Sequence, residues 1–187
     1  MGTEIEKKYR LTPGAVEQLR RRLREVGATA RGEEFEENTL YGGHGLDPRS
    51  RVLRVRRVGN RAILTYKERF ASDSAIKHQR EDETEVKDAD ALAAILDALG
   101  YRPALVYEKR RETWQVANVE LVIDQLPFGL FMEIEGEDKS IAEAERLLSL
   151  SETEAEHATY PELTRRYGTK RGDVIEARFG VGDKYGG

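Results

Sequence analysis

Alternation of polar and apolar residues recurs along the chain and predicts a series of β-strands. In the first run Glu4, Glu6 and Lys8 fall on one face, while Ile5, Lys7 and Tyr9 fall on the other. The same period of two appears loosely at 28–41 and clearly at 53–56, 62–67, 80–86, 107–113, 119–124 and 131–135. Taken alone, each run is also typical of an exposed edge strand or of a half-exposed sheet with its charges in water.

Helical spacing of apolar residues appears between these runs. Thr12-Pro13 provides an N-cap and a proline at the first helical position, and four arginines follow between positions 20 and 24. We expect these arginines to form a solvated helix face. The opposite face carries the apolar stripe of this first helix, which consists of Val16, Leu19, Leu23 and Val26.

Three further helices are predicted from caps and periodicity. Asp88 caps the second helix, Ser140 and Glu143 form a capping box for the third, and a short helix occupies 160–168. The predicted stripe of the second helix is Leu92, Ile95, Leu96 and Leu99. We therefore expect the apolar faces of the strands to pack against helices.

The length of 187 residues favours one domain, which we place at 1–168. Residues 169–187 show no convincing period and contain several glycines, so we expect a flexible tail there.

Composition excludes several classes of protein. Charged residues make up 35% of the chain, but the net charge is only −4, which argues against stable nucleic-acid binding because that needs a basic surplus. The absence of cysteine excludes disulfides and thiolate metal sites. No apolar run of about 18 residues predicts a membrane span, and no apolar signal-peptide core is present. A cytoplasmic protein with no membrane partner is the simplest expectation.

Like charges repeat on single strand faces, which an ordinary half-buried sheet does not explain. Because we expect the helices to cover the apolar faces of the strands, we expect the strands to close into an antiparallel barrel that encloses the charges. Enclosed charges must be paired, hydrated or bound to ions. Basic side chains would hold a polyanion and carboxylates would hold divalent metals that bridge to it, so the pattern indicates a triphosphate site. The residues concerned are Glu4 with Glu6, Arg54 with Arg56, Glu83 with Glu85, Lys109 with Arg111, and Glu133 with Glu135, joined by Lys8, Lys67 and Asp124.

These residues resemble, in order, the signature of the CYTH superfamily, the triphosphate tunnel metalloenzymes. Glu4-Ile5-Glu6-Lys7-Lys8 matches its Glu-x-Glu-x-Lys motif, and the ordered resemblance extends from Glu4 to Gly168. The resemblance implies an α+β fold built on an eight-stranded closed antiparallel barrel with helices packed outside. It also implies chemistry on triphosphates that depends on Mg²⁺ or Mn²⁺.

The resemblance implies three sets of roles. Metal ligands would be Glu4, Glu6, Glu133, Glu135 and Asp124. Phosphates would be bound by Lys8, Arg54, Arg56, Lys67, Lys109 and Arg111. Catalytic roles, including a second metal or the orientation of water, would fall to Glu83, Glu85, Asp124 and Lys67.

Hydrolysis of the terminal phosphoanhydride of an inorganic or organic triphosphate is the function that the resemblance favours. The run at 126–136 resembles the bacterial cyclase-like branch, so a class IV adenylate cyclase remains an alternative. Leu53-Arg54-Val55-Arg56 stands where such cyclases carry a His-Phe-Arg element, which speaks against that alternative. A non-catalytic polyphosphate- or nucleotide-binding module is the third. Tripolyphosphate, thiamine triphosphate and ATP all stay open as substrates, and so does assembly as a homodimer.

Overall fold

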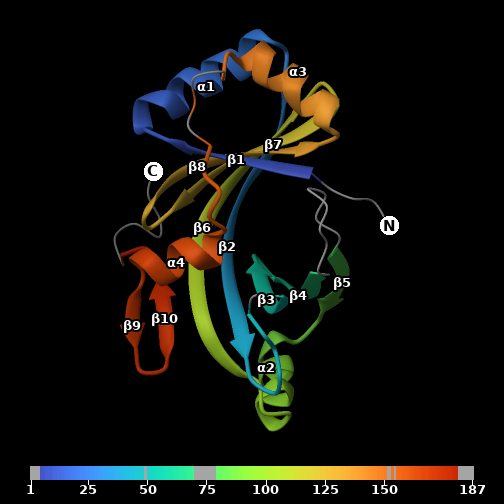
Figure 1. The fold of residues 1–187 in the computed structure, drawn as a ribbon, viewed down its shortest axis with the longest axis vertical. Helices are drawn as coiled ribbons and strands as arrows, with labels where there is room; N and C mark the ends of the chain where they lie inside the picture. The colour runs from blue at the N-terminus through green and yellow to red at the C-terminus, as the bar shows by residue number, and fades with distance from the viewer. Residues whose placement is uncertain (1–4, 49, 70–78, 151–152, 154, 181–187) are drawn as a thin grey trace. The chain divides into compact units, whose positions relative to one another are not determined.

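The computed structural model describes residues 5–48, 50–69, 79–150, 153 and 155–180, which form an α+β fold (Figure 1). The helices are α1 (Pro13–Glu25), α2 (Ala89–Ala98), α3 (Asp138–Leu148) and α4 (Tyr160–Tyr167). The strands are β1 (Ile5–Leu11), β2 (Thr29–Gly42), β3 (Arg51–Val58), β4 (Arg61–Arg69), β5 (Gln79–Val86), β6 (Arg102–Val116), β7 (Val119–Leu126), β8 (Gly129–Gly136), β9 (Thr169–Arg171) and β10 (Val174–Ala177). Of the described helices, none is long and apolar enough to cross a membrane.

The strands form one sheet in the order β1-β8-β7-β6-β2-β3-β4-β5, with β10 beside β6 and β9 beside β10. Pairing is antiparallel in β1–β8, β8–β7, β7–β6, β2–β3, β3–β4 and β4–β5. The prediction of an antiparallel sheet of eight strands accompanied by helices is confirmed. The order has two ends, β1 and β5, where the prediction had a closed ring. Charge alternation along a strand fixes which face a residue takes, but it carries no information on which edges pair.

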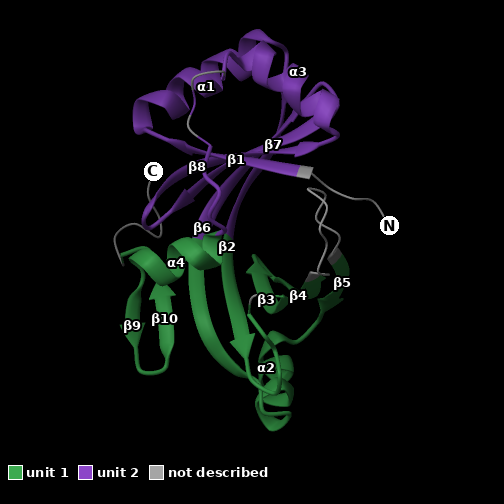
Figure 2. Cartoon of the chain, viewed as in Figure 1, with its two compact units in different colours: residues 1, 36–108, 160–187 green, residues 2–35, 109–159 purple. Residues whose placement is uncertain are grey.

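The chain divides into two compact units, shown in different colours in Figure 2. Unit 1 comprises residues 1, 36–108 and 160–187, and unit 2 comprises residues 2–35 and 109–159. The long strands β2 and β6 each contribute residues to both units.

Unit 2 has its hydrophobic core between α1, α3 and one face of β1, β8, β7 and β6 (Figure 1). Leu23 of α1, Ala144 of α3 and Ile134 of β8 are all completely buried there. Alternate residues of the same strands point away from this core, which is why the charged positions of β1 and β8 share the opposite face. Here the predicted covering of apolar strand faces by helices is confirmed.

The caps of the two unit 2 helices differ from each other. Thr12 caps α1 as predicted, because its side chain accepts a hydrogen bond of 3.2 Å from the backbone N–H of Ala15. The capping box predicted for α3 is wrong: the helix begins at Asp138, its N-cap is Glu137, and this residue makes no side-chain cap hydrogen bond. Ser140 therefore lies inside the first turn instead of at the cap.

The arginine face of α1 is less solvated than predicted. The Arg20 Nε donates a hydrogen bond of 2.9 Å to Glu112 on β6, and the Arg22 Nε donates one of 2.9 Å to the backbone carbonyl of Leu147. Both side chains lie flat over neighbouring elements and still expose part of their surface.

In unit 1, α2 begins where the sequence predicts, since the Asp88 side chain accepts from the backbone N–H groups of Asp90 and Ala91. The stripe predicted for this helix is only partly correct. Leu96 is buried, whereas Ile95 and Leu99 are 56% and 58% exposed. The helix itself carries alanine and other apolar residues on nearly every side, so the spacing of apolar residues does not identify one buried face.

Within the segment predicted as a flexible tail, residues 169–177 form the β9–β10 hairpin, and residues 181–187 lie outside the described part. Strand β10 pairs with β6 in parallel, with Ile175 opposite Leu105 and Ala177 opposite Tyr107. Directly after it, the buried carboxylate of Glu108 accepts hydrogen bonds from Arg178 Nη1 at 3.1 Å and from the backbone N–H of Phe179 at 2.8 Å. This strand is too short for its alternation to be noticed in the sequence.

Candidate functional site

The unit 2 charged face is the side of β1, β8, β7 and β6 that lies opposite the helices. Cross-strand register places Lys8 opposite Glu133, Glu6 opposite Glu135 and Arg111 opposite Asp124. Because these partners alternate with the core residues of the same strands, they all point to one side. The described residues of this face that the sequence predicted are Glu6, Lys8, Lys109, Arg111, Asp124, Glu133 and Glu135.

Ion pairs link most of this face into one chain of contacts. Lys8 Nζ lies 3.2 Å from Glu133 Oε1 and 3.8 Å from Glu6 Oε1. Arg111 Nη2 lies 2.8 Å from Glu133 Oε2. Arg111 also donates to both oxygens of Asp124, through Nε at 2.8 Å and Nη2 at 2.6 Å.

Asp124 sits at the buried end of this chain of contacts. Its side chain is 0% exposed, and Lys109 Nζ, on a side chain only 5% exposed, adds a further contact at 3.4 Å. A carboxylate fully removed from water is stable only when cations compensate its charge. Asp124 therefore depends on Arg111 and Lys109, and these two cations depend on Asp124.

The surroundings of Glu133 disfavour the charged form of its carboxyl group. Burial raises the pKa of its carboxyl group, the negative charges of Glu6 and Asp124 raise it further, and Lys8 and Arg111 oppose this rise without cancelling it. A cation placed near Glu6 and Glu133 would relieve this repulsion.

The carboxylates of this face fit a hard divalent cation by donor type, since Mg²⁺ and Mn²⁺ both prefer oxygen ligands. Within the part of the chain that the structure describes, however, no three carboxylate or imidazole side chains gather closely enough to form a metal site. Glu4, the first of the predicted ligands, lies outside the described residues. The metal-ligand roles of Glu4, Glu6, Glu133, Glu135 and Asp124 therefore stay a prediction.

A segment at 155–159 borders the β1 edge and adds groups that the sequence did not reveal. Its Glu156 N–H donates to the Lys8 carbonyl at 2.8 Å, and the Ala158 carbonyl accepts from Lys8 Nζ at 3.3 Å. The side chain of Glu156 accepts from Arg10 Nη2 at 3.4 Å. A backbone carbonyl as a ligand leaves no sequence signal.

The unit 1 charged face lies on β3, β4 and β5. Arg54 is opposite Thr65, and Thr65 is opposite Glu83. Arg54 Nη2 donates to Thr65 Oγ1 at 3.3 Å, and that hydroxyl donates to Glu83 Oε2 at 3.0 Å. Arg56 Nη2 reaches the same Glu83 oxygen at 3.4 Å. Thr65 is completely buried and was not predicted as a site residue.

The other predicted residues of this face also fall on it. Lys67 lies opposite Glu81 and pairs with it at 2.8 Å, while Glu85 lies opposite Ile63. On β2, buried Glu36 lies 4.0 Å from Arg56 and accepts a hydrogen bond of 3.2 Å from Asn38. The alternation at 28–41 is too loose to identify Glu36 as a site residue from the sequence.

Among the described residues of unit 1, three buried polar atoms have no hydrogen-bond partner: Arg54 Nε, Arg56 Nε and Asn38 Oδ1. A buried guanidinium N–H without an acceptor is costly. Arg54 and Arg56 therefore have capacity for an additional acceptor, such as an anion's oxygen.

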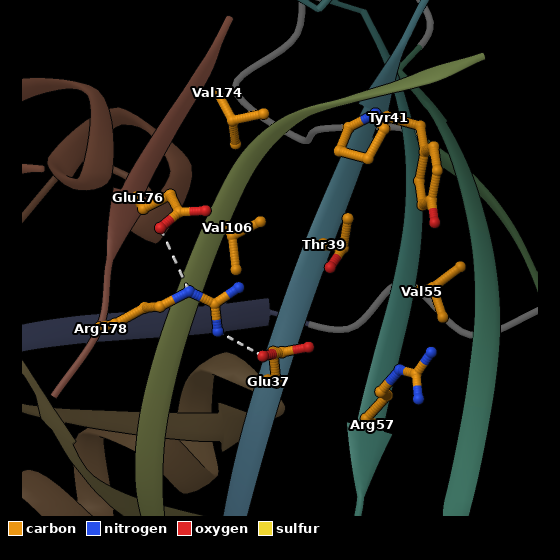
Figure 3. A pocket seen from close by; sticks show the side chains of 10 residues that line it. Glu37, Thr39, Tyr41, Val55, Arg57, Val106, Val174, Glu176 and Arg178 are labelled. Atoms are coloured by element: carbon orange, nitrogen blue, oxygen red, sulfur yellow. Dashed lines mark hydrogen bonds and ion pairs between the residues drawn. The ribbon is translucent and has the colours of Figure 1, made fainter. Parts of the chain in front are cut away.

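A separate cavity of about 310 Å³ opens on the other side of β2 and β3 within unit 1 (Figure 3). Arg57 and Tyr41 line it, and Arg178 pairs there with Glu37 and with Glu176. Because Arg57 and Val55 alternate with Arg54 and Arg56 along β3, this cavity does not share the unit 1 charged face.

The chain is similar to several known proteins. A protein of Methanocaldococcus jannaschii that is provisionally named as an adenylate cyclase is 27% identical over 129 residues, which cover 67% of this chain and 73% of the relative. A solved protein structure from Pyrococcus horikoshii is 28% identical, covers 86% of this chain and 98% of its own, and superimposes with a TM-score of 0.71.

A Hippeastrum protein, provisionally named as an adenylyl cyclase and described as having a dominant triphosphatase activity, is 17% identical. It covers 87% of this chain and 94% of its own with a TM-score of 0.67, and at that identity the likeness shows the fold alone. The model of the CYTH domain matches residues 2–167. By this match over most of its length, the chain belongs to the CYTH family.

Proposed function

We propose that this chain is a divalent-cation-dependent enzyme that hydrolyses the terminal phosphoanhydride of a triphosphate. The observation that carries the proposal is the unit 2 charged face. There the buried cations Lys8 and Lys109 and the half-buried Arg111 contact carboxylates, one of which, Glu133, has a raised pKa. Cations that can bind a polyanion, clustered with carboxylates that can bind metal, suit an anion that arrives together with metal.

The basic residues of both faces would bind phosphate oxygens. In unit 2 these are Lys8, Lys109 and Arg111, and Asp124 would position the last two, because its oxygens accept from both. In unit 1, Arg54 and Arg56 have Nε groups without partners, and these would gain acceptors from phosphate. Lys67 is 31% exposed and would exchange Glu81 for an anion at small cost.

The acidic residues would supply metal ligation and proton transfer. Mg²⁺ or Mn²⁺ held by Glu6, Glu133 and Glu135, together with Glu4, would neutralise charge that develops on the phosphoryl oxygens. Glu83 and Glu85 would orient the attacking water and accept its proton. The water oxygen then forms a bond to the terminal phosphorus as the bridging P–O bond breaks, which releases phosphate and the shortened polyphosphate.

Adenylate cyclase activity is the second candidate, favoured by the name of the Methanocaldococcus jannaschii relative. In that reaction the ribose 3′-hydroxyl would attack the α-phosphorus and pyrophosphate would leave. The same basic residues would serve both reactions, so the identity of the nucleophile separates the two. A binding module without catalysis would have little use for so many carboxylates around an anion.

Product analysis tests the proposal. The protein is incubated with ATP, tripolyphosphate or thiamine triphosphate and with Mg²⁺ or Mn²⁺, and phosphate, pyrophosphate and cyclic AMP are separated. We expect orthophosphate with the corresponding diphosphate, and no release in excess EDTA. Equimolar cyclic AMP and pyrophosphate from ATP would establish the cyclase instead, and tight binding without any product would leave a binding module.

Substitution of one proposed ligand sharpens this test. Glu6→Gln keeps the shape of the side chain but removes a negative ligand, and we expect turnover to fall by roughly 100-fold or more, because metal-ion catalysis supplies several kcal/mol. Glu143→Gln, on the exposed side of α3, is the matched control and should leave turnover unchanged. Full metal-dependent activity in Glu6→Gln would remove Glu6 from the site.

A further inference from the structure

The chemistry of paired residues changes steadily along β1 and β8. From one end to the other of the unit 2 charged face, the cross-strand pairs are Glu6 with Glu135, Lys8 with Glu133, and Arg10 with Phe131. Two carboxylates thus give way to an ion pair, and the ion pair to an arginine on an aromatic ring. A ligand that follows these strands meets carboxylates first, then the Lys8 cation, and finally the planar guanidinium of Arg10 on its aromatic support.

Arg10 is held in a defined position on that surface. Its guanidinium carbon lies 4.9 Å from the centre of the Phe131 ring, and its Nη2 donates to Glu156 at 3.4 Å. Phe131 is completely buried, whereas the side chain of Arg10 is 38% exposed. Phe131 therefore acts as a support, and Arg10 presents the accessible surface.

Phe128 and Gly129 complete this corner at the turn before β8. The ring of Phe128 meets that of Phe131 edge to face, with centres 6.0 Å apart and planes at 71°. Gly129 has φ +154°, and a methyl group there would lie 3.4 Å from the Phe131 ring and 3.5 Å from Arg10 Nη1. Glycine thus leaves Arg10 room beside the turn.

We propose that Arg10, supported by Phe131 and flanked by Phe128, is the subsite for the base of a nucleoside triphosphate. Guanidinium and aromatic planes are surfaces on which nucleobases stack. Arg10 lies two strand residues, about 7 Å, beyond Lys8, so a base would follow a phosphate chain bound at Lys8. This assignment rests on the proposed function, and it names the organic end of its substrate.

The charge of Arg10 selects among the candidate substrates. Tripolyphosphate has no planar group for this surface. The thiazolium ring of thiamine triphosphate carries a positive charge, which Arg10 would repel. A neutral nucleobase avoids both difficulties, so the subsite favours ATP or another nucleoside triphosphate over the other two.

The experiment compares ligands that differ only at the organic end. Affinities for ATP and tripolyphosphate are measured by calorimetry with Mg²⁺, using analogues with imido bridges that resist hydrolysis so that binding is read without turnover, and kcat/KM is then measured with the natural compounds. Arg10→Lys keeps the charge but loses the plane. We expect it to weaken ATP about 5- to 100-fold, the usual loss for one stacked base, and tripolyphosphate less than about twofold. Phe128→Leu, which keeps apolar bulk, should shift the same ratio in the same direction.

Arg24→Lys, an exposed arginine on α1, is the control and should change neither affinity. Melting temperatures of all variants show whether they fold, and Phe128→Leu carries the test if Arg10→Lys does not. Equal losses for ATP and tripolyphosphate would make Arg10 a phosphate ligand, and no loss for either would remove it from the site. Each of these results overturns the base subsite. Selective loss of ATP binding in a chain without hydrolysis would uphold the subsite and refute the proposed function.

Discussion

The unit 2 and unit 1 charged faces carry the same residue types but satisfy them differently. In unit 2 the side chains of Lys8, Lys109 and Asp124 are at most 7% exposed, and each cation contacts a carboxylate. The side chains of Arg111 in unit 2 and Arg56 in unit 1 are both 20% exposed, but Asp124, the partner of Arg111, is 0% exposed, whereas Glu83, the partner of Arg56, is 40% exposed. Among the described residues of unit 1, the Nε groups of Arg54 and Arg56 have no hydrogen-bond partner.

This difference separates two tasks. The ionic network of unit 2 is internally compensated, so a phosphate that binds there must displace a carboxylate or arrive with a cation that neutralises one. The arginines of unit 1 have donors to spare and can accept an anion directly. We infer that unit 1 serves mainly affinity for phosphate, whereas unit 2 couples phosphate binding to metal.

The largest expected effect comes from breaking the unit 2 network. Arg111→Met leaves Asp124, which is 0% exposed, without its main cation, and we expect the free energy of unfolding to fall by about 3–5 kcal/mol. Urea denaturation followed by circular dichroism measures this. The double variant Arg111→Met with Asp124→Leu should recover much of the loss, because it removes the orphaned charge. A loss below about 1 kcal/mol in the single variant would show that the network is not the buried, interdependent unit described.

The equivalent change in unit 1 should affect binding more than folding. Arg56→Met removes a cation whose nearer partner, Glu83, is 40% exposed and whose contact with buried Glu36 is as long as 4.0 Å, so we expect a loss of stability within about 1 kcal/mol. Tripolyphosphate affinity should fall roughly 10- to 100-fold, because a charged hydrogen bond contributes about 1.5–3 kcal/mol. Calorimetric titration gives the affinity, and Arg61→Met, at the exposed first residue of β4, is the control. Stability loss as large as that of Arg111→Met would erase the distinction between the two faces.

A smaller effect is expected at Thr65, the hydroxyl between Arg54 and Glu83. Thr65→Val keeps the shape of the side chain, and the lost hydrogen bonds should cost about 1 kcal/mol of stability. Phosphate affinity should fall with it, since Arg54 and Glu83 lose their common partner. An unchanged denaturation midpoint and an unchanged affinity would reduce Thr65 to a packing residue.

The pH dependence of stability gives the smallest but most specific test. The raised pKa of Glu133 means that the folded chain holds this proton more tightly than the unfolded chain does. Its contribution to stability is full below the ordinary carboxyl pKa and is lost as pH rises through the raised pKa. Glu133→Gln is neutral throughout, so its melting temperature relative to the wild type should rise between about pH 4 and pH 8 in EDTA.

Mg²⁺ provides the matching control for this titration. If a cation relieves the repulsion between Glu133 and Glu6, saturating Mg²⁺ should stabilise the wild type at pH 8 and the Glu133→Gln variant much less. A difference in melting temperature that does not depend on pH would mean that Glu133 is not strained in the folded chain.

Much of the fold could be read from the sequence, because alternation along a strand directly fixes its faces. The face shared by Glu6 and Lys8 and the face shared by Arg54 and Arg56 follow from that rule. The contacts that depend on geometry between strands could not be read in the same way. Thr65 is chemically unremarkable until register places it between an arginine and a glutamate.

Backbone groups and short elements were equally hidden. The carbonyl of Ala158 becomes a partner of Lys8 only through the path of the chain, which no residue type records. Strand β10 spans four residues, too few for a period to appear. The capping box predicted at Ser140 does not form, because the N-cap of α3 is Glu137, three residues before Ser140.

The parallel pairing of β10 with β6 has a consequence for where this domain is taken to end. The match to the family model ends at residue 167, yet the guanidinium that pairs with buried Glu108 belongs to Arg178, eleven positions further on. A chain trimmed to the matched residues would keep this carboxylate in the interior and lose Arg178. A transplanted or shortened version of this domain should therefore include the β9–β10 hairpin and Arg178.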